Sequence, residues 1–198
     1  MPDRRLDAST LREWAHTAVG DLIGHTDEIN RLNVFPVADS DTGTNLLFTM
    51  RAALTGAESV SGSAGVVEVT AALAEGALGG ARGNSGVILS QILRGLADVT
   101  AAAAADSDGF VTDVDAVLLG AALRHAVGLV VSSMGGQLVA GTIVSVLQAV
   151  ADTVAQWAAD GATLGEALTA GGDAGVTALE RTPEQLDALA EAGAAHAR

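Results

Sequence analysis

The sequence contains no cysteine and no lysine. Without cysteine, the chain has no disulfide framework and no thiolate ligands for a metal. Without lysine, it has neither a Schiff-base nucleophile nor the lysine of a Walker A phosphate-binding loop. All 10 basic residues are therefore arginines. These absences exclude several common kinds of catalytic site before any motif is considered.

Aromatic side chains are also scarce, at 3% of 198 residues, and tyrosine is absent. Apolar residues still make up 49%, which is enough for a sizeable core and excludes a disordered chain. A core of Ala, Val and Leu with few rings favours closely packed helices, because strands prefer β-branched and aromatic residues. We therefore predict an all-α fold, with residues 1–198 forming one domain.

Positive charge is outweighed by negative charge, and the formal net charge is −14. Such a surface argues against nucleic acid as a partner, because phosphate backbones are bound mainly through Lys and Arg. The start of the chain, MPDRRLDASTLREWAH, is charged and lacks the apolar segment of a signal peptide. The apolar stretch Val114–Val131 is interrupted by Asp115, Arg124 and His125, so no membrane span is predicted. We expect a cytoplasmic protein.

Apolar residues recur at helical spacing along most of the chain, and no strand with period-two alternation stands out. Thr10 with Glu13 and Thr163 with Glu166 read as capping boxes, and Asp113 reads as a helix N-cap. The eight helices expected are about Thr10–Leu32, Thr42–Leu54, Val66–Leu78, Ser85–Val99, Asp113–Ser133, Thr142–Ala159, Leu164–Leu179 and one that begins around Thr182 and Pro183. Trp14 and Trp157 lie on helical faces and are expected in the core.

Three polar or glycine-rich breaks follow the first, third and fifth of these helices. They are Asn33–Asp41, Gly79–Gly86 and Met134–Gly141. In an eight-helix antiparallel up-and-down barrel or bundle, these three loops fall at the same end. Counting helices therefore predicts that the three breaks contribute to one site.

The first break carries the strongest chemical signal. Asp39 and Asp41 are two residues apart, and carboxylates about 4 Å apart repel by roughly 4 kcal/mol at an effective dielectric near 20. Mg²⁺ would relieve this repulsion, with Asn33 offering an amide oxygen from the same loop. Thr42 and the residues after it open a helix, whose free N–H groups suit phosphate. The alternative is that Asp39 or Asp41 simply caps this helix.

The second and third breaks give weaker signals. In GARGNSG the glycines allow a close approach of backbone to an anion, and Asn84 and Ser85 could cap a helix while donating to phosphate. Arg82 could reach a phosphate or pair with an acid. An ordinary turn between helices has a similar composition. Gly141-Thr142 alone indicates a helix start, and the four histidines have no metal-site spacing.

Together the segments resemble the L-type (DAK2) domain family. NVFPVADSDTGTN, at residues 33–45, is similar to the family pattern NVFPVPDGDTGTN, and GARGNSGVILSQI matches the second family motif. Gly141-Thr142-Ile143 falls where the family has VEGT and an apolar residue, and TPEQLDALAEAG is similar to TPExLPVLKEAG. The family includes the L subunit of dihydroxyacetone kinase and the N-terminal domain of bacterial fatty acid kinase. The first motif is spelled more like the fatty acid kinase branch.

The resemblance implies an eight-helix barrel that holds ADP or ATP and two Mg²⁺ at one end. By motif position, Asn33, Asp39 and Asp41 would hold Mg²⁺. The residues implied to meet the nucleotide are Thr42, Gly43, Thr44, Asn45, Gly83, Asn84, Ser85, Gly141 and Thr142. Catalytic residues are not implied beyond these binding roles.

The sequence departs from the family pattern at three places. Ser40 replaces a family glycine, which would strain the loop if that position needs positive φ. The family's KPVEGT reads QLVAGT, which removes a Lys and a Glu. The family's terminal VDAGG reads Ala195-His196-Ala197-Arg198, so the chain is expected to be a fragment or to bind nucleotide less well.

Three functions follow from the resemblance. The leading hypothesis is the Mg-ATP-binding domain of a phosphotransferase like fatty acid kinase, which phosphorylates an acyl carboxylate presented by a carrier protein. The second is the L-type subunit of dihydroxyacetone (glycerone) kinase, which works with a K-type partner. The third is a non-catalytic nucleotide-binding or scaffold protein. A homodimer is left open.

Overall fold

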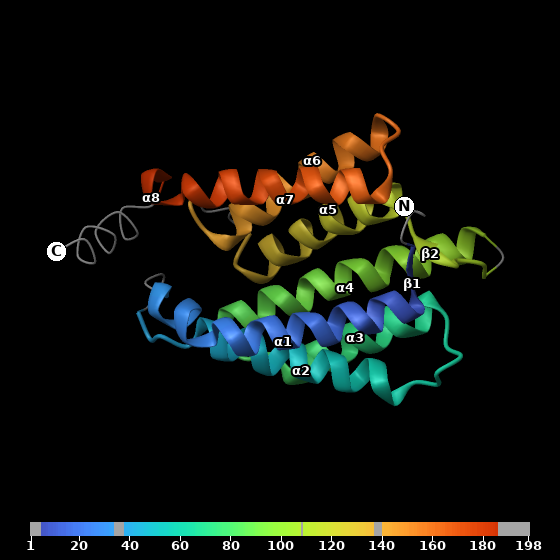
Figure 1. Ribbon diagram of the computed structural model, residues 1–198, viewed down its shortest axis with the longest axis horizontal. Helices are drawn as coiled ribbons and strands as arrows, with labels where there is room; N and C mark the ends of the chain where they lie inside the picture. The colour runs from blue at the N-terminus through green and yellow to red at the C-terminus, as the bar shows by residue number, and fades with distance from the viewer. Residues whose placement is uncertain (1–4, 34–37, 108, 137–139, 186–198) are drawn as a thin grey trace.

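The computed structural model describes residues 5–33, 38–107, 109–136 and 140–185 (Figure 1). Almost all of these residues are helical, which confirms the all-α prediction. The helices are α1 (Ala8–Leu32), α2 (Thr42–Ser59), α3 (Val66–Gly80), α4 (Gly83–Asp106), α5 (Ala116–Ser133), α6 (Ile143–Ala159), α7 (Leu164–Glu180) and α8 (Thr182–Gln185). Two short strands, β1 (Leu6–Asp7) and β2 (Asp113–Val114), complete the described elements.

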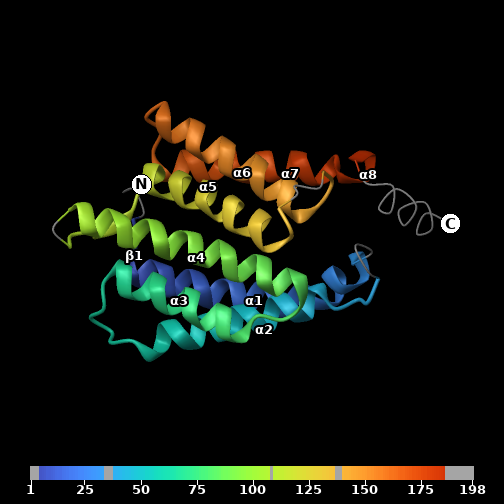
Figure 2. The ribbon, with the colours of Figure 1, turned by 180° about the vertical axis from the view of Figure 1, so that it is seen from behind.

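Successive helices run in opposite directions, and each packs on its neighbour in the chain from α1 to α7. The starts of α2, α4 and α6 therefore lie at one end of the bundle, on the left in Figure 1 and on the right in Figure 2. We call this the site end. The opposite end carries β1 and β2, and we call it the strand end. This is the antiparallel up-and-down order that the spacing of the breaks predicts.

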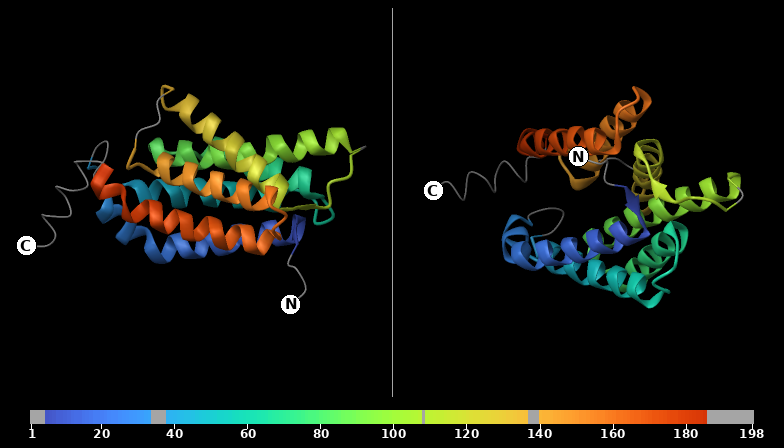
Figure 3. Two further views of the ribbon diagram at one scale, coloured as in Figure 1. Left: turned by 90° about the horizontal axis from the view of Figure 1, so that it is seen from above. Right: turned by 45° about the vertical axis from the view of Figure 1, so that its right-hand side comes forward.

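The core runs through the whole bundle. In the right-hand view of Figure 3, α1–α4 form one group of helices and α5–α7 a second, joined along α4 and α5. One cluster of buried side chains crosses this boundary, and its larger members are Leu11, Met50, Leu73, Leu93, Leu119 and Val154. The two groups therefore share a continuous apolar interior.

Small residues set the distance between the central helices. A Cβ on Gly95 of α4 would lie 2.7 Å from the Cβ of Ala126 on α5. A Cβ on Gly120 of α5 would lie 2.8 Å from the Cα of Ala155 on α6. Contacts this close leave no room for larger side chains, which explains how a chain poor in aromatics still fills its interior.

Two helices are longer than their local patterns indicate. α2 continues past the predicted Leu54 to Ser59, and α4 continues past Val99 to Asp106. The extension of α4 takes in the alanine run at residues 101–105. Alanine has the highest helix propensity, so the run prolongs α4. The extension of α2 includes Gly56, where a Cβ would lie only 2.3 Å from the carbonyl oxygen of Ala72.

Helix starts were predicted with mixed success. The Thr163–Glu166 capping box of α7 is confirmed, with reciprocal hydrogen bonds between the two residues. The Thr10–Glu13 box is wrong, because α1 begins at Ala8 and Asp7 accepts the Thr10 N–H at 2.9 Å. Asp113 is also not an N-cap. Asp115 caps α5 instead and accepts the Leu118 N–H at 2.8 Å.

Asp113 lies in β2, where it pairs with Asp7 across a two-residue antiparallel ladder. The Arg5 guanidinium, 3.5 Å from the Asp113 carboxylate, adds an ion pair beside this ladder. The absence of a strand signal in the sequence was therefore misleading at this one place. Two residues are too few for a period-two pattern to be visible.

The two tryptophans are not core residues. Trp14 on α1 is 42% exposed and Trp157 on α6 is 45% exposed, so the prediction that they are buried is wrong. Each lies at the edge of an otherwise apolar helical face, where the 3.6-residue period does not separate a flank from the centre. The core positions belong to smaller aliphatic residues.

Two of the described helices, α4 and α5, are long and apolar enough to cross a membrane by length and composition alone. Core helices also pass that test, and both contribute buried side chains to the central cluster. Their composition is therefore accounted for by packing within the bundle. The prediction that no segment spans a membrane stays a prediction.

Candidate functional site

The start of α2 lies at the site end, directly after the two predicted carboxylate ligands. Asp41 is the N-cap residue of α2, and its carbonyl oxygen accepts the first helical hydrogen bond from the Asn45 N–H at 2.8 Å. The Asp41 side chain makes no capping hydrogen bond. This removes capping of α2 as a role for the Asp41 carboxylate, which is half-buried at the start of the helix.

The other predicted ligands lie on the same loop. The Asn33 side chain donates from Nδ2 to Asp39 Oδ1 at 2.5 Å, which joins the two sides of the loop. Ser40, between the aspartates, has φ of +57°, and it is the one non-glycine residue with positive φ in the described ranges. This position therefore requires positive φ, which the glycine of the family pattern adopts without strain. Val34 to Val37, the apolar part of the motif, lie outside the described residues.

Gly83 and Gly86 of the second motif pack closely against α2, which begins in the first motif. A Cβ on Gly83, whose φ is +56°, would lie 2.3 Å from Asn45 Nδ2. A Cβ on Gly86 would lie 2.5 Å from Thr49 Oγ1. The first turn of α4 is therefore in direct contact with the first two turns of α2. Asn45, predicted to meet phosphate, is only 8% exposed and packs against this turn.

The start of α4 also lacks a side-chain cap from its N-cap residue, Arg82. The Arg82 guanidinium instead stacks on the Phe48 ring of α2, 4.3 Å from the ring centroid. Such a contact is worth about 0.5–1 kcal/mol at an exposed position. Asn84 is exposed and Ser85 is half-buried in this first turn. The sequence did not predict the contact with Phe48, since the two residues lie on different helices.

The third motif begins α6. Gly141 has φ of +75° and is buried, and Thr142 forms a capping box with Ser145. A small apolar cluster joins this start to the other helices, with Ile88 of α4, Val130 of α5 and Val144 of α6 at its centre. The starts of α4 and α6 therefore share one patch of core beneath the site end. Gln137 to Val139, the start of QLVAGT, lie outside the described residues.

One residue near these motifs was missed entirely. Asn30, in the last turn of α1, accepts the Thr44 N–H at its Oδ1 (3.1 Å) and donates from Nδ2 to Thr44 Oγ1 (3.0 Å). It therefore caps α2 from a neighbouring helix. Nothing in the local sequence distinguishes Asn30 from an ordinary polar residue at a helix end, so only the tertiary contact reveals it.

The acids whose pKa is shifted lie away from the site end motifs. The Thr10 N–H lowers the pKa of Asp7, and the Thr163 N–H lowers the pKa of Glu166. Burial raises the pKa of Asp98, but hydrogen bonds from Arg94 and His125 outweigh it and lower this pKa overall. These are structural contacts, and none of them marks a catalytic acid.

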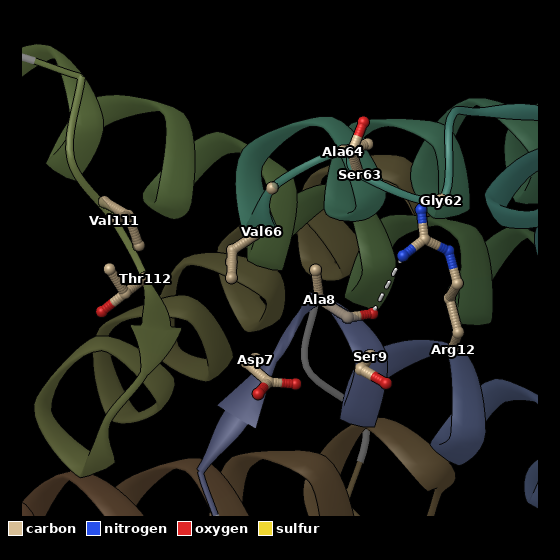
Figure 4. Close-up of a pocket in the computed structure, with 11 residues that line it drawn as sticks. Asp7, Ala8, Ser9, Arg12, Gly62, Ser63, Ala64, Val66, Val111 and Thr112 are labelled. Carbon is tan, nitrogen blue, oxygen red and sulfur yellow. Dashed lines mark hydrogen bonds between the residues drawn. The ribbon is translucent and has the colours of Figure 1, made fainter.

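A cavity with a volume of about 600 Å³ lies at the strand end (Figure 4). Its two charged side chains, Arg12 and Asp7, hold neighbouring backbone in place. The Arg12 guanidinium donates to the carbonyl oxygens of Ala57 (3.2 Å) and Ser61 (2.8 Å), and the Asp7 carboxylate caps α1. We therefore place the candidate site at the other end of the bundle.

Within the described ranges, no three His, Cys, Asp or Glu side chains gather as a metal cluster. The predicted Mg²⁺ ligands include only two acidic side chains, Asp39 and Asp41, together with the Asn33 amide, so they do not form such a cluster. Asn33, Asp39 and Asp41 as metal ligands stay a prediction. The terminal motif Ala195–Arg198 and His196 lie outside the described residues.

Comparison with known proteins gives the family. The profile of the DAK2 domain matches residues 36–198, so the chain belongs to the DAK2 domain family. Protein YloV of Bacillus subtilis is 33% identical over 195 residues, which are 98% of this chain and 33% of YloV. An uncharacterized protein of Staphylococcus saprophyticus is 42% identical over 93 residues, 46% of this chain and 16% of that protein. One from Staphylococcus aureus is 47% identical over 76 residues, 37% of this chain and 13% of that protein.

The chain spans about a third of the length of YloV and less of the staphylococcal proteins. Membership of the DAK2 family makes it a nucleotide-binding domain of the kinase type, associated with ADP or ATP. This result agrees with the resemblance carried by the three motifs.

Proposed function

We propose that this chain is the Mg-ATP-binding domain of a phosphotransferase like fatty acid kinase, which transfers phosphate to an acyl carboxylate presented by a carrier protein. The observation that carries the proposal is the meeting of two helix starts. α2 and α4 begin side by side at the site end, and neither is capped by the side chain of its N-cap residue. Helix starts without such caps, next to Asp39 and Asp41, suit a phosphate chain with its cation.

The donors at this loop fit Mg²⁺. Asp39 and Asp41 offer carboxylate oxygens, and the Asp41 side chain is not used to cap its helix. Asn33 donates through its nitrogen to Asp39, which leaves its amide oxygen as the atom of that side chain suited to a cation. An all-oxygen set with two acids and bound nucleotide is the usual environment of Mg²⁺. A second Mg²⁺, which the family resemblance implies, belongs to the same proposal.

Each motif has a distinct task in this proposal. Asp39, Asp41 and Asn33 hold Mg²⁺, which when bound neutralises phosphate charge during transfer. Thr42 and Gly43 present the backbone of the first turn of α2 to phosphate, and Thr44 and Asn45 hold that turn against its neighbours. The remaining residues are on α4 and α6: Gly83, Asn84 and Ser85 border the phosphates, and Gly141 and Thr142 lie toward the nucleoside.

A second candidate is nucleotide binding without turnover. It is favoured by the positive φ of Ser40, because a non-glycine residue in this conformation costs about 1–2 kcal/mol. Strain between the two carboxylates would make their productive arrangement less populated. A cytoplasmic location and the absence of nucleic-acid partners are further proposals that rest on the sequence alone, and a homodimer is left open.

Calorimetric titration of ATP with and without Mg²⁺ tests the binding proposal. We expect Mg²⁺-dependent binding that Asp39→Asn weakens at least about tenfold, since a direct ligand contributes 1.4 kcal/mol or more. Asp27→Asn is the control, because it removes the same charge from the exposed face of α1. Binding that does not depend on Mg²⁺, or equal losses in the two variants, would contradict the proposal.

The acceptor needs a separate assay. Phosphate transfer should be measured with an acyl-carrier partner and, in parallel, with a K-type partner and dihydroxyacetone. Transfer only in the first assay supports the fatty acid kinase proposal, and transfer only in the second supports the dihydroxyacetone kinase alternative. Mg-ATP binding without transfer in either assay supports the non-catalytic candidate.

A further inference from the structure

Asn30 caps the N-terminus of α2, a role that the sequence would assign to Asp41. The first N–H groups of a helix need partners, and the residue at the N-cap usually supplies one through its side chain. Asp41 occupies the N-cap position of α2, and aspartate is among the best N-cap residues. Its side chain nevertheless makes no capping bond. The Thr44 N–H is bound by Asn30 instead.

Both polar atoms of the Asn30 amide bond to Thr44. Asn30 Oδ1 accepts the Thr44 N–H at 3.1 Å, and Asn30 Nδ2 donates to Thr44 Oγ1 at 3.0 Å. Both ends of one amide are therefore used on one residue. The two residues lie on either side of the loop that carries Asn33, Asp39 and Asp41, so the amide bridges the base of that loop.

Close packing of α2 against α1 surrounds this contact between Asn30 and Thr44. A Cβ on Gly43 would lie 2.5 Å from the Thr26 carbonyl oxygen and 3.0 Å from Asn30 Oδ1. The first turn of α2 therefore rests directly on the last turns of α1. Asn30 is half-buried in this contact, which protects its two hydrogen bonds from competition by water.

We propose that Asn30 is a positioning residue that caps α2 in place of Asp41 and so leaves the Asp41 carboxylate to Mg²⁺. This inference rests on the proposed Mg-ATP binding. Without Asn30, the Asp41 side chain is the nearest local group able to accept the Thr44 N–H, because an N-cap side chain reaches the third residue of its helix. A carboxylate drawn into capping is turned away from the cation.

Asn30→Ala tests the proposal when it is compared with two other variants. Asp115→Ala removes a cap of the same kind at the strand end, where Asp115 binds the Leu118 N–H, and controls for a general loss of stability. Asn30→Asp keeps an acceptor for both the N–H and the hydroxyl of Thr44, and serves as the conservative rescue. Thermal unfolding of all the variants shows which of them remain folded.

The main measurement is the Mg²⁺ concentration that gives half-maximal ATP binding. We expect it to rise about tenfold in Asn30→Ala, because Mg²⁺ binding then requires the Asp41 carboxylate to give up a cap worth about 1.4 kcal/mol. It should stay at the wild-type value in Asp115→Ala and within about threefold of it in Asn30→Asp. Amide hydrogen exchange at Thr44 should stay slow in Asn30→Ala, because Asp41 replaces the lost acceptor.

The outcomes separate this inference from the function on which it rests. An unchanged Mg²⁺ requirement in Asn30→Ala overturns the role of Asn30 while the nucleotide site stands. An equal rise in Asp115→Ala also overturns it, because the effect is then one of stability. A wild-type protein that binds no ATP at any Mg²⁺ concentration overturns the proposed function and the role of Asn30 together.

Discussion

The two ends of the bundle differ in how the N–H groups at the starts of their helices find hydrogen-bond partners. At the strand end, α1, α5 and α7 begin with side-chain caps from Asp7, Asp115 and Thr163, and Arg12 binds the carbonyl oxygens of the neighbouring turns. At the site end, α2 and α4 begin without a cap from their own N-cap residues. Among α1, α3, α5 and α7 at the strand end, only α3 lacks a side-chain cap. Among α2, α4 and α6 at the site end, α2 and α4 lack one from their N-cap residue, and α6 has a capping box.

The site end compensates for these missing caps with close contacts between helices. Asn30 holds the start of α2, and glycines on α2 and α4 bring their first turns against neighbouring atoms. This difference suggests that the strand end serves stability and that the site end gives up local stability for binding, as functional sites often do. Each of the following changes tests that division.

The largest effect is expected at Gly43. In Gly43→Ala the new Cβ would lie 2.5 Å from the Thr26 carbonyl oxygen, so α1 and α2 must separate. We expect about 2–3 kcal/mol lower stability in urea unfolding, and loss of Mg-ATP binding in the folded fraction. Gly24→Ala on α1 is the control, because a Cβ there meets no atom within 4 Å and should stabilise the helix. Equal stability of the two variants would contradict the close contact.

A change at the strand end should affect stability alone. Arg12→Met keeps the length of the side chain but loses its hydrogen bonds to the Ala57 and Ser61 carbonyl oxygens. We expect about 1–2 kcal/mol lower stability with an unchanged Kd for Mg-ATP. Arg51→Met on the exposed face of α2 should leave both quantities unchanged. Weaker nucleotide binding in Arg12→Met would show that the two ends are coupled.

Ser40→Gly should relieve strain at the site end. Glycine adopts φ of +57° without the steric penalty that serine has, so the loop between the aspartates is stabilised. We expect a gain of about 1 kcal/mol in unfolding free energy, together with tighter Mg-ATP binding. Ser107→Gly is the control, since φ there is −119° and glycine brings no relief. A loss of stability in Ser40→Gly would show that serine is favoured at this position.

The smallest effect concerns acid pH at the strand end. The pKa of Asp7 is lowered from 3.8 by the Thr10 N–H, so its contribution to stability is complete above pH 3.8 and is lost as pH falls through the lowered pKa. Asp7→Asn keeps a good cap without the titrating group. We expect its unfolding free energy to fall less than that of wild type below about pH 4. A fall in Asp7→Asn parallel to that of wild type would exclude this source of acid sensitivity.

Local patterns predicted much of this fold correctly. The Thr163–Glu166 box, the helices that follow it and the placement of the three breaks at one end depend on spacing within short segments. Two errors were local, because the caps of α1 and α5 are the nearby Asp7 and Asp115. Other errors arose where a partner lay elsewhere in the chain. Asp113 pairs with Asp7 in a ladder, and Trp14 and Trp157 are partly exposed while smaller aliphatic residues fill the core.

The residues of the candidate site also divide into those that local sequence identifies and those that only tertiary contacts reveal. The carboxylates Asp39 and Asp41, the motif around Asn84 and the strained position of Ser40 could all be identified from the sequence, since each depends on neighbouring residues. The roles of Asn30 and Phe48 could not. Asn30 and Thr44 are 14 residues apart, and Phe48 meets Arg82 from another helix, so neither contact leaves a periodic or compositional trace.

By itself, the sequence determined the all-α class and the order of the helices, because helical periodicity, caps and glycine breaks act over a few residues. The family followed from the resemblance of its motifs to the family patterns. Only the tertiary structure decided which side chain caps α2, and thereby which carboxylate is left for a cation. That choice depends on the distance between α1 and α2, which Gly43 sets by packing against the Thr26 carbonyl oxygen. Contacts of this kind form only when the helices come together.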